Sequence, residues 1–157
     1  MIMSNPEIDN YGNQLWFNEK RQLHRLNGPA AEYANGDKIW YQHGKCHRLD
    51  GPAVDYSNGD KWWYQHDKLH RKDGPAIEWA DGTKWWYQHG KCHRLDGPAF
   101  ELACGYKSWI LYDKKHREDG PAIEFPDGNR QWWIDDKQIN VNSQEEFERY
   151  MRLKAFW

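Results

Sequence analysis

Histidine, arginine and aspartate recur together in this chain at a constant spacing. His47, Arg48 and Asp50 stand in the phrase His-Arg-Leu-Asp-Gly-Pro-Ala, and close versions of that phrase return every 23 residues. Histidine beside a carboxylate could act as a general base, and histidine with cysteine could bind zinc. The phrase begins at His24, His47, His70, His93 and His116, and these histidines number copies one to five.

Neither chemistry is favoured by the pattern. An enzyme needs one asymmetric site, whereas this trio occurs five times without a nucleophile that has an identifiable base. A zinc site on Cys46 and His47 lacks a fourth ligand, and equivalent residues of adjacent copies lie about 10 Å apart. We therefore expect no catalytic residue, no metal and no cofactor. Each histidine is instead expected to be half-buried beside a tryptophan, with its polar atoms paired.

The composition excludes further classes. The 157 residues carry a net charge of -2, so no basic field favours extended nucleic acid or an anionic membrane. Three cysteines are an odd number, which argues against a disulfide framework and for a reducing compartment. The chain starts without a signal-peptide pattern, and no apolar stretch approaches membrane length. The 11 Trp, 9 Tyr and 5 Phe indicate a core built largely from rings.

The constant period predicts stacked supersecondary units that bury their apolar faces on one another. Each copy carries two turn signals, for example Asn58-Gly59 and His66-Asp67. Asn-Gly is favoured in two-residue hairpins, where both central residues take positive φ, and the segments between turns have strand composition. We expect an all-β fold: a single-layer antiparallel meander with about two strands per copy.

A two-residue turn at Asn58-Gly59 would fix which side chains share a face. Val54 would then lie opposite Trp63, which places the tryptophan found in every copy on the core face. Arg48 and its equivalents would lie on the outer face, paired with acids of their own or an adjacent copy. The predicted binding residues on that outer face are Tyr41, Arg48, Trp62, Tyr64, Arg71, Trp85, Tyr87 and Arg94.

This outer face is the predicted interaction surface. Aromatic and arginine side chains are enriched at protein interfaces, so the first hypothesis is a protein partner, either another protein or a second copy. The alternative is a small nucleotide held by arginine and rings, while an extended polyanion would be repelled by acids such as Glu78. The rings are expected to be densest in copies two and three, because Ser108 and Ile110 interrupt them in copy four.

The last residues differ from the repeats. Ser143-Gln144-Glu145-Glu146 is a capping box, and Phe147, Tyr150, Met151, Lys154 and Trp157 fall largely on one side of a helix. Such a helix would cover the open edge of the sheet. The sequence thus predicts a lead-in at 1–12, a five-copy array at 13–140 and a capping helix at 141–157.

The phrase Trp-Tyr-x-x-Gly-Lys-x-His, at Trp40 to His47 and Trp86 to His93, resembles the MORN repeat, in particular its bacterial and viral variant with a 23-residue period. The resemblance implies a twisted single-layer sheet that curls into a groove, often associates in pairs and serves as a protein-interaction platform. His-Arg-x-Asp-Gly-Pro-Ala replaces the usual His-Gly-x-Gly, so phospholipid binding is not carried over. The resemblance also implies a phage accessory or counter-defence role and a cytoplasmic location, in the host if the chain is phage-encoded.

Overall fold

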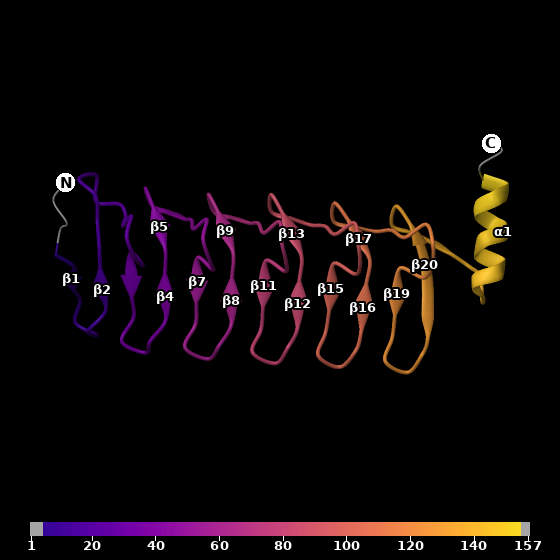
Figure 1. Ribbon diagram of the computed structural model, residues 1–157, viewed down its shortest axis with the longest axis horizontal. Helices are drawn as coiled ribbons and strands as arrows, with labels where there is room; N and C mark the ends of the chain where they lie inside the picture. Colours follow the sequence, from indigo (N-terminus) through magenta and orange to yellow (C-terminus); the bar gives the residue numbers. More distant parts are fainter. Residues whose placement is uncertain (1–4, 155–157) are drawn as a thin grey trace.

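The structure is a computed structural model that describes residues 5–154. Copies follow one another along a single axis, and α1 (Gln144–Lys154) stands at the C-terminal end (Figure 1). Within the described residues the long antiparallel sheet has thirteen strands. In spatial order they are β1 (Glu7–Ile8), β2 (Gln14–Leu15), β3 (Ala31–Glu32), β4 (Lys38–Ile39), β7 (Val54–Asp55), β8 (Lys61–Trp62), β11 (Ile77–Glu78), β12 (Lys84–Trp85), β15 (Phe100–Glu101), β16 (Lys107–Ser108), β19 (Ile123–Glu124), β20 (Arg130–Ile134) and β21 (Lys137–Ile139).

Each of copies one to four also carries a small hairpin above the long sheet, which the sequence did not predict. Trp63 makes the connection: its N–H donates to the Ala76 carbonyl of the long sheet, and its carbonyl accepts from His70 N–H of the hairpin. The expected all-β repeat sheet with a capping helix is confirmed, with these hairpins added. They pair β5 (Tyr41–Gln42) with β6 (Lys45–Cys46), β9 (Tyr64–Gln65) with β10 (Lys68–Leu69), β13 (Tyr87–Gln88) with β14 (Lys91–Cys92), and β17 (Ile110–Leu111) with β18 (Lys114–Lys115).

Of the two turns in a copy, the upper one has the predicted two residues, whereas the lower one is longer than predicted. At the lower turn, Tyr56 N–H donates to Asp60 O at 3.0 Å and Gly59 N–H donates to Tyr56 O at 2.9 Å, which encloses three residues with Gly59 at φ 98°. This is a type I turn followed by a left-handed glycine. The two-residue turn with both φ positive lies instead at His66 (51°) and Asp67 (62°).

The extra residue in the lower turn overturns the predicted faces. Val54 lies opposite Trp62 rather than Trp63, and the same shift holds for Ile77 and Trp85. A one-residue slip exchanges the two sides of a strand. Trp62 therefore packs on the side of Val54, and Trp63 lies on the other side.

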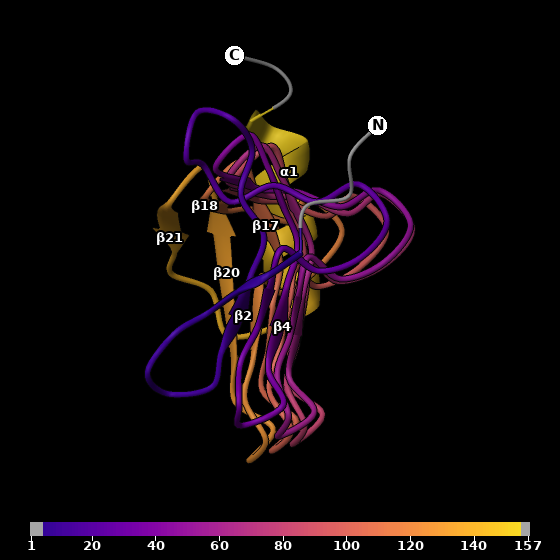
Figure 2. The same ribbon diagram turned by 90° about the vertical axis from the view of Figure 1, so that its left-hand side faces the viewer.

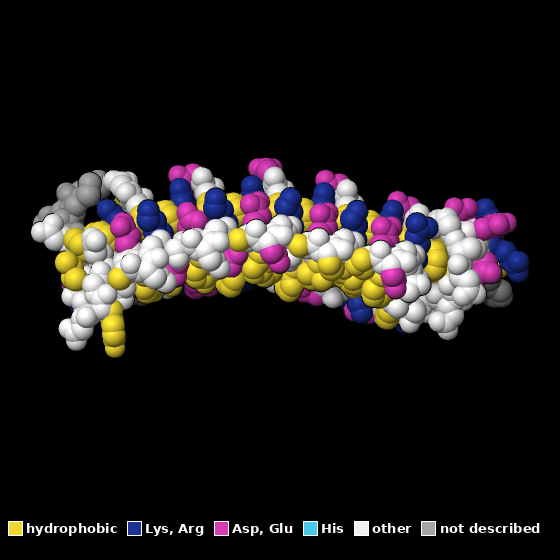
Figure 3. Space-filling view, turned by 90° about the horizontal axis from the view of Figure 1, so that it is seen from below, with side chains coloured by type: hydrophobic (Ala, Val, Ile, Leu, Met, Phe, Trp, Pro, Cys, Tyr) yellow, Lys and Arg dark blue, Asp and Glu magenta, His cyan; other side chains and the backbone are white. Residues whose placement is uncertain are grey.

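The sheet has two chemically distinct faces. The aromatic face is defined by the ring-rich positions Tyr41, Tyr56, Trp62, Tyr64, Trp79, Trp85, Tyr87, Phe100, Tyr106 and Phe125. The arginine–tryptophan face is defined by Trp16, Trp40, Trp63, Trp86 and Trp109 with Arg25, Arg48, Arg71, Arg94 and Arg117. Seen from below, hydrophobic side chains form a band along one side of the array, and alternating basic and acidic side chains line the other (Figure 3).

That alternation follows from the strand register. Lys61 of β8 lies between Asp55 of β7 and Glu78 of β11. Opposite charges on neighbouring strands stabilise a sheet modestly. The stacked copies superpose closely when the array is viewed along its axis (Figure 2), so the same row continues from copy to copy.

The C-terminal helix covers the last copy as predicted. Phe147 is fully buried and packs with Trp132 and Ile134. Ser143 caps the helix: Glu146 N–H donates to Ser143 Oγ at 3.2 Å, while the Glu146 carboxylate accepts from Asn142 N–H at 2.8 Å, one residue before the N–H that a capping box uses. Trp157, expected on the same side of the helix, lies outside the described residues.

Candidate functional site

Each arginine of the arginine–tryptophan face lies flat on the tryptophan of the preceding copy. The distance from Cζ to the ring centroid is 3.9 Å for Arg71 on Trp63 and 4.1 Å for Arg94 on Trp86. Arg71 Nη1 also donates to the Pro75 carbonyl at 3.1 Å and to Glu78 at 2.7 Å. The contact with Trp63 joins copy three to copy two, while the bonds to Pro75 and Glu78, within copy three, hold the guanidinium in place, so this face helps to hold the stack together.

The carboxylate pairing predicted for Arg48, Arg71 and Arg94 is confirmed. Arg94 pairs with both Asp96 and Glu101, whereas Arg48 pairs with Asp50. The glycine of Gly-Pro leaves room for the guanidinium: a Cβ at Gly97 would lie 2.8 Å from Arg94 Cζ. Because Arg48, Arg71 and Arg94 lie on the other face, the structure does not bring them together with Tyr41, Trp62, Tyr64, Trp85 and Tyr87, and that part of the predicted site is wrong.

The histidines join consecutive hairpins. Nδ1 of His70 accepts the backbone N–H of His89 at 3.0 Å, and the two rings lie 4.4 Å apart. His24 and His47 do the same with His43 and His66. Burial, followed by the charge of the neighbouring histidine, lowers the pKa of His24, His47 and His70 below the usual 6.5, so each is a neutral acceptor.

Copy four departs from this arrangement. The Nδ1 atom of His93 is buried and has no hydrogen-bond partner among residues 5–154, although its ring stacks on Tyr112 at 4.1 Å. Burial alone lowers the pKa of His93. The predicted pairing therefore holds for His24, His47 and His70 but not for Nδ1 of His93, and His47, His70 and His93 are buried rather than half-buried.

Cysteine and histidine do not converge on an ion site. Cys46 is buried on the aromatic face, its Sγ 3.9 Å from the Ala53 carbonyl, and burial raises its pKa to about 12. His47 follows it on the opposite side of the strand. Among residues 5–154, no three histidine, cysteine or acidic side chains are close enough to hold a metal.

Rings on the aromatic face touch one another along the array. Trp79 contacts Trp85 at 5.1 Å between centroids, and Trp85 contacts Phe100 at 4.6 Å. Phe100 contacts Tyr106 at 5.7 Å, and Tyr106 contacts Phe125 at 5.4 Å. These contacts are edge-to-face, which is a favourable aromatic geometry. One chain of rings thus connects copies three, four and five.

The expected break in copy four is wrong for the touching rings, which continue through Phe100, and right at the position of Tyr64 and Tyr87, which Ile110 occupies. Ser108 does replace the tryptophan of β12, but its cross-strand partner is Phe100, where copies two and three have Val54 and Ile77. The large side chain has moved to the neighbouring strand, and Ser108 is buried beside it. The sequence contains this exchange, but it is recognisable only with the correct register.

A column of tyrosines borders the rings. Tyr64 lies 6.4 Å from Trp62, and Tyr87 stacks on Trp85 at 6.1 Å. In the described part of the chain no hydrogen bond engages the hydroxyl group of Tyr64 or Tyr87, and neither oxygen is buried. Burial raises the pKa of Tyr64, and that of Tyr87 to about 12, so both hydroxyls stay protonated donors.

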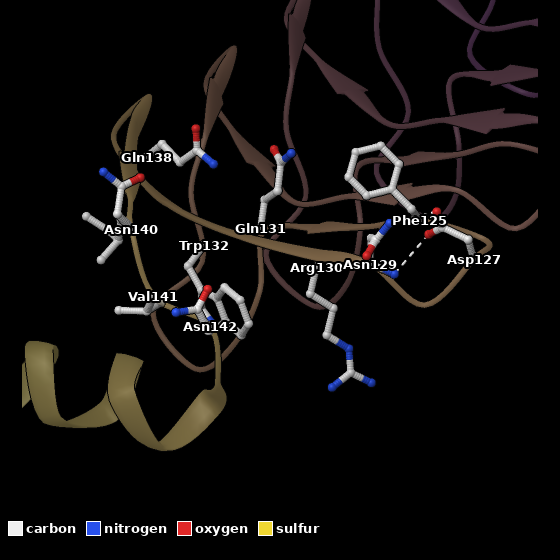
Figure 4. A pocket seen from close by; sticks show the side chains of 11 residues that line it. Phe125, Asp127, Asn129, Arg130, Gln131, Trp132, Gln138, Asn140, Val141 and Asn142 are labelled. Atoms are coloured by element: carbon white, nitrogen blue, oxygen red, sulfur yellow. Dashed lines mark hydrogen bonds between the residues drawn. The ribbon is translucent and has the colours of Figure 1, made fainter.

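An open hollow of about 590 Å³ lies at the C-terminal end, between the last lower turn and the segment leading to α1 (Figure 4). Asp127, Asn129, Arg130 and Asn142 line it, but Asn129 is already paired with Asp127, and the Trp132 ring in its wall is buried. Its polar groups do not converge on one point, so the aromatic face is the stronger candidate site.

Comparison with known proteins leaves the function to be argued from this geometry. No family model matches the chain, and no curated protein is similar to it. No helix among the described residues is both long and apolar enough to cross a membrane.

Proposed function

We propose that this chain is a non-enzymatic binding protein whose aromatic face contacts another protein. The observation that carries the proposal is the run of touching rings from Trp79 to Phe125 on one side of a sheet that has a single layer. Aromatic side chains offer large, rigid contact area and are enriched at the energetic centres of protein interfaces. The MORN resemblance, with its interaction platforms, supports the same function.

The arginines favour a protein over the nucleotide alternative. A nucleotide phosphate would need guanidinium donors that are free and close to the rings. Arg71 instead lies on Trp63 and donates to Pro75 and Glu78, on the face away from Trp62 and Tyr64. Moving it to a phosphate would break contacts that hold two copies together. A phage accessory or counter-defence role, in the host cytoplasm, remains a prediction from the resemblance.

Photo-crosslinking tests the proposed function. We would place p-benzoylphenylalanine at Tyr64 or Tyr87, express the protein in its native host and irradiate the cells. Leu49 and Leu95 are matched control positions: they are 75% and 81% exposed and lie in the loops that hold the arginines. We expect a defined protein adduct from positions 64 and 87 and none from 49 and 95. Equal adducts from both pairs, or none from 64 and 87, would reject the proposal.

A further inference from the structure

We propose that the partner segment is proline-rich, adopts the polyproline II conformation and lies along the aromatic face, across the strands. This inference rests on the proposed function and names the chemistry of the partner. Aromatic-lined grooves are a recurrent docking surface for such segments, which have little conformational entropy left to lose on binding. Three observations support it: the period of the array, the donors on the face and the lack of charge.

The period of the array matches that of polyproline II. Each copy adds two strands to the long sheet, so Tyr64 and Tyr87 are separated by about 9.6 Å along the array, at ~4.8 Å per strand. Polyproline II has three residues per turn and rises ~3.1 Å per residue, which gives about 9.3 Å per turn. Every third side chain would therefore meet the equivalent rings of the next copy, with a drift of about 0.9 Å over three copies.

Other regular conformations fit this period less well. Two turns of an α-helix span about 10.8 Å, so a helix would lose register by about 3.6 Å over three copies. An extended strand returns to the same face every ~6.8 Å, which is not a simple fraction of the array period. Of the three regular peptide conformations compared, only polyproline II has a repeat length that matches the spacing of the copies over several copies.

The tyrosines supply the donors that such a segment needs. Backbone carbonyls of polyproline II have no internal hydrogen bonds. Among the described residues the hydroxyl groups of Tyr64 and Tyr87 are unpaired, and a tyrosine holds this position in copies one to three, so these hydroxyls can donate to carbonyls one turn apart. The indole N–H groups of Trp62 and Trp85 also lack partners in the part of the chain that the structure describes, although both are buried within the layer of rings.

The rings of the strip carry no charge, and the acids nearest to them lie at its border. Asp67 and Asp113 act on the hydroxyl groups of Tyr64 and Tyr87, but each carboxylate already accepts the backbone N–H of a cysteine. Lys61 and Glu78 lie on the opposite side of the strands. A neutral, apolar segment rich in proline suits such a surface better than a charged peptide, which would lose hydration without gaining a counter-charge.

The test uses acetylated, fluorescein-labelled polyproline peptides of three, six, nine and twelve residues, with fluorescence anisotropy on the full chain. We expect affinity to rise with each added turn, by about threefold, as one more copy is engaged. An alanine-based helical peptide and an alternating Thr-Val peptide of twelve residues should bind at least tenfold more weakly than the twelve-residue polyproline. Affinity independent of length, or no preference for polyproline, would overturn the inference.

Conservative variants locate the site. Tyr64→Phe and Tyr87→Phe remove only the hydroxyl donors, and each should weaken binding about fivefold, the equivalent of one hydrogen bond. Tyr112→Phe is the matched control, because Tyr112 lies on a hairpin tip, 63% exposed, against His93. Equal loss in all three variants, or in none, would count against docking on the tyrosine column.

The outcomes separate this inference from the proposed function. If positions 64 and 87 crosslink to a protein but polyproline does not bind, the proposed function stands and the polyproline inference fails. If neither occurs, both fail. A particle mass twice that of the chain, halved by Tyr64→Lys with Tyr87→Lys, would assign the face to a second copy and overturn the inference.

Discussion

The two faces of the sheet share the same strands and the same period, yet they differ in how they vary. On the arginine–tryptophan face every copy repeats the same residues, and each guanidinium has a ring, a carbonyl and a carboxylate as partners. On the aromatic face the position of Trp62 is Ile39 in copy one and Ser108 in copy four. The invariant face joins each copy to the next through the same arginine–tryptophan contact, whereas the aromatic face joins copies through rings that differ from one copy to another.

This difference separates two tasks. A residue that joins one copy to the next must be the same in each copy, because the geometry of stacking is the same. A residue on the uncovered face needs only to fill space, so it is free to change with what it meets. We therefore assign stacking to the arginine–tryptophan face and recognition to the aromatic face, and the following substitutions test that assignment.

The largest effect is expected where the helix replaces arginine. Asn140 stands where the repeat would place an arginine after Trp132, and Phe147 of α1 packs against Trp132 instead. Phe147→Ala should lower the free energy of unfolding by about 4 kcal/mol, because the side chain is fully buried. Phe125→Ala, half-buried on the aromatic face, should cost about half as much. Urea denaturation of both variants checks this, and a larger loss for Phe125 would contradict it.

A second pair of substitutions gives copy three the residues that copy four has at two paired positions, Phe100 and Ser108. Trp85→Ser alone should cost about 2 kcal/mol, since it leaves a gap beside Ile77 and Trp79. Adding Ile77→Phe should restore at least about 1 kcal/mol, because Phe100 fills the equivalent gap opposite Ser108. The coupling energy is measured from the two single variants and the double variant. Strictly additive losses would show that the exchange in copy four is not compensatory.

The glycine beneath each arginine offers a smaller test. Gly97→Ala should cost about 1 to 2 kcal/mol, because the new methyl group would push Arg94 off Trp86. In an Arg94→Ala background the same substitution should cost little. Thermal unfolding of the four proteins in this cycle measures the difference. An equal cost in both backgrounds would mean that the glycine is needed for another reason.

Acid should weaken the hydrogen bonds by which histidines connect consecutive hairpins. The pKa values of His24, His47, His70 and His93 are lowered in the folded chain, so the unfolded chain takes up protons first. Their stabilisation is complete above about pH 6.5 and is lost as the pH falls below it toward the folded pKa values. The hydrogen bonds of His24, His47 and His70 contribute about 1 kcal/mol each, whereas Nδ1 of His93 has no such bond to lose.

Urea midpoints between pH 8 and pH 5 measure this dependence, in a range where carboxylates stay ionised. The His70→Phe variant should be less stable than the parent at pH 8. Its urea midpoint should also fall less between pH 8 and pH 5, because one titrating imidazole has been removed. A profile as steep in His70→Phe as in the parent would exclude that histidine as a cause.

Much of the fold could be predicted because its signals are local. The 23-residue period, the turn dipeptides and the capping box at Ser143 each depend on neighbouring residues, and the sheet and helix follow from them. The charge pairing of Arg71 could be predicted for the same reason: an acid occurs at a constant offset in every copy.

The faces could not be predicted, because they depend on one residue in one turn. Asn58-Gly59 suits a two-residue turn, but it also suits a three-residue turn in which only Gly59 takes positive φ, and the chain adopts the second. The histidine and aspartate of the true two-residue turn, His66 and Asp67, are weaker signals. Because of that ambiguity, Trp62 and Trp63 were each predicted on the wrong face of the sheet. The residues of the predicted site therefore lie on both faces instead of one.

The most direct test compares two adjacent tryptophans that receive the same substitution. Trp62→Ile places on the aromatic face the residue that copy one already has there, Ile39, and should cost about 1 kcal/mol or less. Trp63→Ile removes the ring under Arg71 and should cost about 3 kcal/mol. The measurement is the free energy of unfolding of both variants in urea. We predict the larger loss at Trp63, and an equal or larger loss at Trp62 would contradict the division of tasks between the two faces.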